Sequence, residues 1–197
     1  MRDGYSRAEQ AEATRAELLS AARELFAERG YADVGTEEIV RATGVTRGAL
    51  YHHFRDKRDL FREVHESLER ELVERIGASM QGTDDPLELI ELGLRAFLDA
   101  CMEPAVIQIA LIDAPTVLGW QEWREIDAKY GMGLVSFGLQ NAIDAGAMPA
   151  RDVRPLAHLV LAALGEAAML IATADDPKAA RQEVEGPLVA LLEGLTR

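Results

Sequence analysis

Hydrophobic side chains recur at spacings of three and four residues along almost the whole chain, and no segment shows the strict alternation of a β-strand. This pattern predicts an all-α protein. In the first predicted helix, Thr14 and Glu17 have the spacing of a capping box, in which each side chain satisfies a backbone N–H of the first turn. Gly30 is expected to end this helix. Its predicted core face consists of Leu18, Ala21, Ala22, Leu25 and Phe26.

Three further helix starts follow in close succession. Thr36 is placed to cap a short helix that ends at Gly44, and Thr46 is placed to cap the next one. Asp56 then begins a longer helix that runs toward Met80 and presents one apolar stripe. We therefore expect three short helices, joined to the rest of the chain by a longer fourth.

The second part of the chain carries about five more helices. Asp85 followed by Pro86 is typical of a helix start, because proline lacks the N–H that the first turn leaves unpaired anyway. Pro104 and Pro115 delimit two shorter helices, and a long helix should cover residues 120–145.

Two more helices are expected, one over residues 152–174 and the last from residue 176 onward. Gly186-Pro187 lies midway in the last helix and should kink or split it. The expected architecture is an all-α fold of about nine helices. In it, an N-terminal three-helix head (residues 1–61) stands on a larger C-terminal helical bundle (residues 62–197).

The composition is that of a soluble globular protein. The 197 residues are 48% hydrophobic and 28% charged, and a single cysteine, Cys101, excludes an internal disulfide framework. The polar start of the chain is unlike a secretory signal. The longest apolar stretch, residues 156–174, is interrupted by His158, Gly165 and Glu166, so it falls short of the roughly 18 uninterrupted apolar residues of a membrane span. We expect a cytoplasmic protein without a membrane segment.

The net charge of −13 argues against a nucleic-acid partner, but the distribution of charge does not. Most of the acidic excess lies beyond residue 60. Residues 41–58 contain one acidic side chain, Asp56, and five basic ones: Arg41, Arg47, Arg55, Lys57 and Arg58. Because salt screens charges beyond about 8 Å, a local positive patch of this kind is sufficient to meet phosphates.

The segment that begins at Thr36 has the layout of a helix-turn-helix, whose second helix enters the DNA major groove. Thr36 and Thr46, at helix starts, offer a hydroxyl and unpaired backbone donors to phosphate oxygens. Arg47 is the candidate for base recognition, since its guanidinium matches the acceptor pair of guanine. Gly48 and Ala49 let the helix approach the groove closely, and Ala49 can touch a thymine methyl group.

The same segment resembles the TetR family of one-component transcriptional regulators. The resemblance covers about residues 12–61 and is carried by Leu25-Phe26, Gly30-Tyr31, Thr36, Ile39, Ala42, Gly44-Val45, the run Arg47-Gly-Ala-Leu-Tyr-His-His-Phe54 and the run Asp56-Lys57-Arg-Asp-Leu60-Phe61. It implies that Tyr51, His53 and Lys57 contact phosphates, with His52 as a further neighbour. Such contacts set the register on the duplex and do not read its sequence.

Several of these residues also have a purely structural interpretation. Leu50 and Phe54 are expected in the core of the head, without a role on DNA. Tyr51 taken alone fits a capping aromatic, and His52 and His53 taken alone fit a solvated surface. Adjacent residues diverge on a helix, so the two histidines are a poor metal site. We expect no metal and no cofactor.

The helix within residues 156–174 is apolar on nearly every side and must therefore be covered on nearly every side. A second copy of the chain is the simplest cover, and with the last helix it would build the intersubunit four-helix bundle that the TetR resemblance implies. The alternative is burial within its own chain. The predicted interface residues are Leu156, Leu159, Val160, Ala163, Ala167, Leu170, Leu188, Leu191 and Leu195. A two-fold dimer implies a palindromic operator.

The middle helices are rich in aromatic and sulfur-containing side chains, which suit an adaptable ligand cavity but more often form ordinary core. The candidate lining residues are Phe97, Cys101, Gln108, Asp113, Trp120, Trp123, Tyr130, Phe137 and Glu166. A carboxylate that faces such a cavity favours a cationic or hydrogen-bond-donating ligand. The expected effector is an unidentified small molecule of apolar or amphipathic character.

An enzyme is the main rival class. The chain has no Gly-rich phosphate loop, no Gly-x-Ser-x-Gly motif and no metal-ligand spacing of His and Cys. His158 and Glu166 lie two turns apart on one helix, which is typical of packing. We expect a homodimeric, ligand-responsive repressor that a small molecule releases from its operator. The alternative is a DNA-binding dimer whose body has no small-molecule effector and serves dimerisation or protein contacts.

Overall fold

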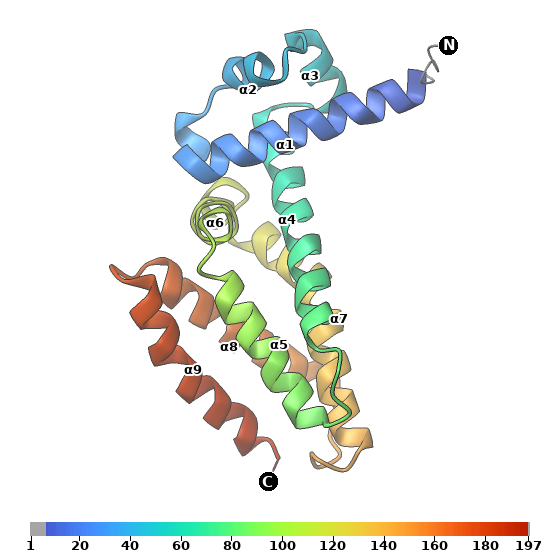
Figure 1. The fold of residues 1–197 in the computed structure, drawn as a ribbon, viewed down its shortest axis with the longest axis vertical. Coiled ribbons are helices and arrows are strands. Elements are labelled where there is room, and N and C mark those ends of the chain that lie inside the picture. Colours follow the sequence, from blue (N-terminus) through green and yellow to red (C-terminus); the bar gives the residue numbers. More distant parts are fainter. Residues whose placement is uncertain (1–6, 197) are drawn as a thin grey trace.

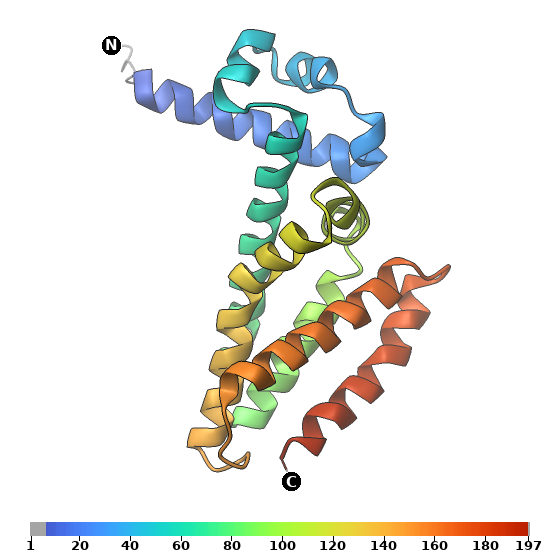
Figure 2. The same cartoon turned by 180° about the vertical axis from the view of Figure 1, so that it is seen from behind.

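The structure is a computed structural model that describes residues 7–196. Within that range the chain forms nine α-helices and one π-helix and no strand, which confirms the all-α fold (Figure 1). A head of α1–α3 stands on an elongated body, and α4 runs from one into the other (Figures 1 and 2). The elements are α1 (Arg7–Asp33), α2 (Thr36–Thr43), α3 (Arg47–His53), α4 (Lys57–Ser79), α5 (Pro86–Ala100), the π-helix η1 (Val106–Asp113), α6 (Ala114–Val117), α7 (Trp120–Asp144), α8 (Val153–Ala172) and α9 (Pro177–Gly194).

The later helices of the head begin and end through the predicted caps. The Thr46 hydroxyl accepts a hydrogen bond from the backbone N–H of Ala49 at 3.2 Å, and the Asp56 carboxylate accepts one from the N–H of Asp59 at 2.8 Å. Gly44 ends α2 in the left-handed region at φ 71°, where glycine pays no side-chain penalty. The buried core of the head contains Leu18, Phe26, Ile39, Leu50, Phe54 and Phe61, so Leu50 and Phe54 lie where they were expected.

Two helix starts differ from the expected ones. Helix α1 begins before Thr14, so Thr14 and Glu17 lie inside it; the preceding residues are Arg, Ala, Glu and Gln, which favour helix strongly enough to extend it. The residue that caps α2 is Gly35, whose N–H donates to the Glu38 carboxylate at 3.1 Å. Thr36 is therefore the first helical residue, and its hydroxyl is free to contact another helix.

The head is joined to the body at the end of α1. Gly30 interrupts α1 as predicted, with φ 78° and ψ 161°, although one further helical turn follows it. Directly after it, the Tyr31 N–H donates to the Asp113 carboxylate of η1 at 2.7 Å. From α4, the Arg58 guanidinium donates to the Leu118 carbonyl at 3.0 Å. Hydrogen bonds from two helices of the head thus converge on the η1–α6 segment.

In the body, α5 and α7 pack against α4, α8 packs against α7, and α9 packs against α5 and α8 (Figure 2). Helices α5, α8 and α9 begin at the predicted aspartates, each of which accepts a backbone N–H of its helix: Asp85, Asp152 and Asp176. Helix α9 is not split, because Pro187 lies inside one continuous helix. Gly186, Pro187 and Glu183 are all exposed, so water is available to the Glu183 carbonyl, which loses its helical partner at the proline.

The segment between α5 and α7 has a geometry that the hydrophobic period did not indicate. Pro104 precedes η1, and Pro115 lies in the first turn of α6, so the two shorter helices exist where they were expected. The first of them, however, is a π-helix, a rare form whose hydrogen bonds join residues five apart and which spacings of three and four residues do not indicate. Helix α4 continues unbroken through position 61, so the division into residues 1–61 and 62–197 falls inside a helix and stays a prediction.

Candidate functional site

Helix α3 presents one exposed face at the end of the molecule opposite the body (Figure 1). The exposed residues of this face and its cap are Thr46, Arg47, Gly48, Tyr51 and His52. Ala49 and His53 are half-buried at its edge, and Leu50 points into the core. The fold thus brings the residues predicted on α3 onto one surface.

Thr36 of α2 supports this face from beneath. It is buried, and its hydroxyl oxygen lies 3.4 Å from the Tyr51 hydroxyl oxygen. The Arg47 guanidinium stands over the Tyr51 ring at 5.5 Å from its centroid. These two neighbours lower the pKa of Tyr51 from its ordinary value, with the hydrogen bond from Thr36 as the larger cause. Thr36 therefore positions Tyr51 in this conformation and does not itself face solvent.

Arg47 is available for base contacts but is paired in the free protein. One of its guanidinium nitrogens lies 3.2 Å from a carboxylate oxygen of Glu37, and 64% of its side chain is exposed. An exposed ion pair of this kind contributes about 1 kcal/mol or less. A guanine edge can displace Glu37 at small cost.

Lys57 lies differently from the expectation for a phosphate contact. Its ammonium group donates a hydrogen bond to the Tyr31 carbonyl and stands over the Tyr31 ring, 4.0 Å from the centroid. Burial lowers the pKa of Lys57. In this conformation Lys57 ties α4 to the end of α1, because α1 ends at Asp33 and the Tyr31 carbonyl lies in its last turn, where carbonyls have no helical partner. A phosphate contact by Lys57 stays a prediction.

His52 and His53 lie side by side, with ring centroids 5.4 Å apart in an edge-to-face arrangement. Within residues 7–196 no group of three or more His, Cys, Asp or Glu side chains is arranged to hold a metal ion. The two histidines are placed to border the exposed face of α3, where the resemblance put them.

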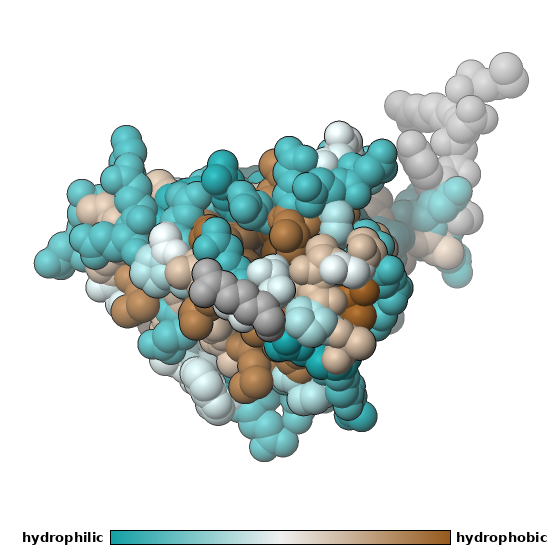
Figure 3. All heavy atoms as spheres, turned by 90° about the horizontal axis from the view of Figure 1, so that it is seen from below, coloured by the Kyte–Doolittle hydropathy of each residue, from teal (hydrophilic) through white to brown (hydrophobic). Residues whose placement is uncertain are grey.

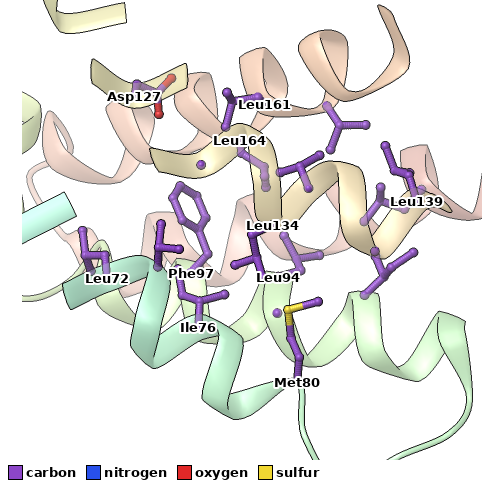
Figure 4. A pocket seen from close by; sticks show the side chains of 18 of the residues that line it. Leu72, Ile76, Met80, Leu94, Phe97, Asp127, Leu134, Leu139, Leu161 and Leu164 are labelled. Atoms are coloured by element: carbon purple, nitrogen blue, oxygen red, sulfur yellow. The ribbon is translucent and has the colours of Figure 1, made fainter. Parts of the chain in front are cut away.

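The body contains an elongated cavity of about 120 Å³ between α4, α5, α7 and α8 (Figure 4). Its wall is almost entirely aliphatic and includes Leu72, Ile76, Leu94, Phe97, Leu134 and Leu161. A second cavity of about 140 Å³ shares Ile90, Leu139 and Leu192 with the first and extends it toward the C-terminal end of the chain. Figure 3 looks onto this end of the body, where apolar side chains reach the surface between charged ones.

Two carboxylates line the cavity at the end nearer the head. Glu69 comes from α4 and Asp127 from α7; Asp127 lies at one edge of the carbon-lined space in Figure 4. Burial raises the pKa of Glu69 to about 8 and also raises the pKa of Asp127. The sequence analysis missed both residues. The available signal was Glu69 on the apolar stripe of α4, directly after Leu68 and three residues before Leu72.

Of the nine residues predicted to line a pocket, Phe97 does so. Most of the others hold the tertiary structure together. The Trp123 indole N–H donates to the Ala110 carbonyl at 3.0 Å, and the Tyr130 hydroxyl lies 2.6 Å from a carboxylate oxygen of Glu66. The remaining core or junction residues are Cys101, which is buried, Gln108, whose amide lies against Gly30, and Asp113, which accepts the Tyr31 N–H.

The other predicted lining residues point outward. Trp120 is 65% exposed, Phe137 is 56% exposed, and Glu166 is exposed on α8. The aromatic residues indicated helices that line the cavity but not which face of each helix lines it. That face depends on the neighbouring helices. The lining set predicted from the sequence is corrected accordingly.

The residues predicted for the dimer interface divide between two faces. Leu159, Leu170 and Leu191 form an exposed apolar stripe on α8 and α9, with exposed fractions of 70%, 51% and 62%. Leu156, Ala163 and Leu195 are half-buried. Ala167 and Leu188 are buried in the chain's own core, and Val160 lines the cavity, so these three turn toward the body.

Helix α8 is the one helix of residues 7–196 that is long and apolar enough to cross a membrane by length and composition. Its inner side packs against α7 and α9, with Ala157, Leu161 and Ile171 buried. The apolar side chains of α8 therefore lie on two faces, an inner face packed within the fold and the outer stripe that contains Leu159 and Leu170.

Two family models match the chain. Residues 18–64 match the bacterial regulatory proteins of the tetR family, and residues 87–195 match the tetracyclin repressor-like C-terminal domain. The transcriptional regulator TtgR of Pseudomonas putida is 32% identical over 72% of this chain and 71% of its own length. The crystal structure of a TetR-family regulator from Pectobacterium atrosepticum is 36% identical, covers 97% of both chains and has a TM-score of 0.86.

Other similarities are shorter or concern the fold alone. The regulator AcrR of Shigella flexneri is 44% identical over 66 residues, so the chain spans about a third of that relative (31%). RolR, solved with resorcinol, is 22% identical, with a TM-score of 0.73 over 94% of this chain and 90% of RolR.

A helix-turn-helix head on an all-α body defines a one-component regulator of transcription. The chain belongs to the TetR family. It is a DNA-binding transcriptional regulator and not an enzyme.

Proposed function

We propose that the chain is a ligand-responsive repressor, which binds a palindromic operator as a homodimer and leaves it when a small molecule occupies the body cavity. The observation that carries this proposal is the course of α4. The same helix begins beside α3 at the Asp56 cap and farther along lines the cavity with Glu69, Leu72 and Ile76. A ligand that moves this wall therefore moves the head. It releases DNA only if it binds the DNA-incompetent arrangement of the heads more tightly.

The DNA-binding surface is the exposed face of α3. Arg47 reads a guanine, and Gly48 and Ala49 allow the close approach that this contact needs. The phosphate contacts come from Thr46, Tyr51, His52, His53 and Lys57, with Thr36 holding Tyr51. The exposure of Thr46, Tyr51 and His52, and the position of His53 at the edge of the same face, support this assignment. Lys57 must release the Tyr31 carbonyl to reach a phosphate.

The dimer surface is the outer stripe of α8 and α9. Three exposed leucines on two neighbouring helices are an unusual surface for an isolated protomer. A two-fold axis that passes this stripe and runs along the length of the molecule places two α3 helices on the same side of the dimer, as a palindrome requires. Leu159→Glu should convert the dimer to monomers in sedimentation velocity. Leu87→Glu, at an exposed leucine of α5, is the matched control and should leave the dimer intact.

The central test is a fluorescence-anisotropy titration of the ligand-stripped, refolded protein against the duplex upstream of its own gene. We expect tight binding of two protomers per palindrome that weakens steeply with salt. Arg47→Ala should lose the preference over a scrambled duplex, and Arg95→Ala on α5 should keep it. Absence of binding to any palindrome at low salt would contradict the proposal. DNA binding that no small molecule alters would favour the dimer without an effector.

A further inference from the structure

We propose that the effector is an organic cation with a compact apolar skeleton, whose protonated amine is held by Glu69 at the head-proximal end of the cavity. This inference rests on the proposed effector role of the cavity. It adds the chemistry of the ligand and the residue that recognises it.

The dimensions of the cavity set the size of the skeleton. An apolar cavity of roughly 150 Å³ in a protein core holds a benzene ring. The inner cavity here measures about 120 Å³, and the outer cavity of about 140 Å³ continues it past Ile90 and Leu139. A single ring or a short alkyl chain therefore fits the inner part, with room for extension outward.

The charges that line both cavities have one sign. Within residues 7–196 the ionisable side chains of the lining are all carboxylates: Glu69 and Asp127 inside, Glu91 and Glu193 in the outer cavity. An anionic ligand would meet no basic side chain in this lining, and burying an unpaired charge is costly. A cation meets carboxylates at the entrance and again at the inner end.

Of the two carboxylates in the inner cavity, Glu69 is the one without an ion pair to a basic side chain or a hydrogen bond; Glu193 of the outer cavity is exposed to solvent. Asp127 is paired with Arg124 at 3.1 Å, and Glu91 lies 3.7 Å from Arg95. By contrast, Glu69 forms no hydrogen bond within residues 7–196, and its nearest ionisable neighbour is His65, with Nδ1 3.8 Å from Oε1. His65 is fully buried, and neither of its ring nitrogens has a hydrogen-bond partner in the described chain.

At neutral pH neither of these two groups carries a charge. Burial raises the pKa of Glu69 to about 8 and lowers the pKa of His65 to about 4, so the carboxyl is protonated and the imidazole is neutral. The other groups around Glu69 do not supply a free positive charge. On α7 Asp127 is matched by Arg124, and at the end of α5 Cys101 is a buried thiol whose pKa is raised.

The α8 side of the cavity is apolar, with Val160, Leu161 and Leu164. An ammonium group placed against Glu69 therefore supplies both the positive charge and the donors that the site lacks. On binding it displaces the Glu69 proton to solvent, so that a carboxylate and an ammonium face each other. A neutral alcohol of the same shape can bind the protonated carboxyl but gains no charge pairing.

Calorimetric titration of the full chain without DNA tests this proposal. The probes are three matched sets, benzyl, phenethyl and hexyl, each as the amine, the alcohol and the carboxylate. We expect the best amine to bind at least about tenfold more tightly than its alcohol, and the carboxylate to bind most weakly. Amine affinity should rise about tenfold per pH unit up to about pH 8, with release of one proton, because Glu69 must ionise.

Glu69→Gln should remove the advantage of the amine, about tenfold or more, and leave alcohol binding unchanged. Glu74→Gln is the matched control, since Glu74 lies on the same helix, is exposed and does not line the cavity. Circular dichroism establishes that each variant is folded. Equal affinity for amine and alcohol, amine binding that survives Glu69→Gln, or no binding of any probe to the folded protein overturns the proposal.

The operator titration of the same protein separates this inference from the proposed function. Intact, specific operator binding together with failure of the amines rejects the ligand class alone. Amine binding through Glu69 without any change in operator affinity supports the ligand class and rejects the effector role.

Discussion

The head and the body of this chain place their polar groups in opposite ways. In the head, Arg47 and Tyr51 stand on an exposed face and interact with near neighbours, as in the 3.4 Å contact between Tyr51 and Thr36. In the body, Glu69 is half-buried in the cavity wall, with the fully buried His65 next to it, and neither has a hydrogen bond within residues 7–196. An exposed polar group is solvated whether or not its partner is present, whereas a buried one without a partner destabilises the fold until a ligand supplies one.

The two regions also differ in how far apart in sequence their contacts lie. Thr36 and Tyr51 are 15 residues apart, whereas Lys129 and Tyr130 reach Glu66 across 63 and 64 residues. A local motif therefore specifies the head. The body depends on the relative placement of whole helices, and this lets the same fold carry cavities of different chemistry.

The largest effect should come from breaking the core of the head. Phe61 packs edge-to-face on Phe26 and Tyr31, with centroid distances of 5.4 and 5.1 Å. Phe61→Ala should lower the free energy of unfolding by about 3–5 kcal/mol and abolish operator binding, because α1 loses its support on α4. Phe137→Ala removes the same atoms at an exposed site of the body and should cost less than about 1 kcal/mol. Thermal unfolding and anisotropy measure both; equal losses in the two variants would contradict the comparison.

In the body, Glu69 should make the free energy of unfolding depend on pH. Folded Glu69 keeps its proton to about pH 8, whereas its ordinary value is 4.5. Between these values the native state binds more protons than the unfolded state, so stability is lost as pH rises from about 4.5 to 8, by about 4 kcal/mol. Glu69→Gln should flatten this decline in urea unfolding, and Glu74→Gln should not.

His65 acts in the opposite direction. Its folded pKa of about 4 lies below the ordinary 6.5, so the unfolded state binds the extra proton and stability is lost as pH falls from about 6.5 to 4. For Glu69, the contradicting outcome is a loss of stability between about pH 4.5 and 8 that persists in Glu69→Gln. That result would show that Glu69 is ionised in the native protein.

Base recognition should be a smaller and more selective effect. Arg47→Ala should reduce discrimination at one operator base pair by about 1–3 kcal/mol while leaving binding to a scrambled duplex nearly unchanged. Arg41→Ala, at an exposed arginine of α2, should weaken all duplexes equally. Anisotropy against a set of single-base operator variants measures this difference, and the assignment of Arg47 fails if the two variants lose the same preference.

Replacing Lys57 should have the smallest effect. It should show whether this residue belongs to the DNA-binding surface or only to the junction of α1 and α4. Lys57→Met keeps the aliphatic stem but removes the donor to the Tyr31 carbonyl, which should cost about 1 kcal/mol of stability. If Lys57 also reaches a phosphate, the slope of log affinity against log salt falls by about 1 for all sequences. Reduced stability with an unchanged salt slope assigns Lys57 to the α1–α4 junction alone.

The sequence predicted the elements best where a helix end depends on its own neighbours. Asp56, Asp85 and Asp152 cap their helices as expected, since each carboxylate and the backbone N–H that donates to it lie within three residues. It predicted the start of α1 poorly, because a capping box competes with the helix-forming residues before it. The predicted split at Pro187 was wrong because, on an exposed helix face, water compensates for the lost hydrogen bond.

By itself, the sequence determined where most helices of residues 7–196 lie, which side chains α3 carries and the apolar character of α8, all of which follow from residues a few positions apart. The tertiary structure alone decided that Lys57 turns inward, that Trp120 and Phe137 face out, and that Glu69 and Asp127 line one cavity. Those outcomes depend on which helices pack together and at what rotation. Burial is a property of contacts between distant parts of the chain, and periodicity within a helix does not encode them.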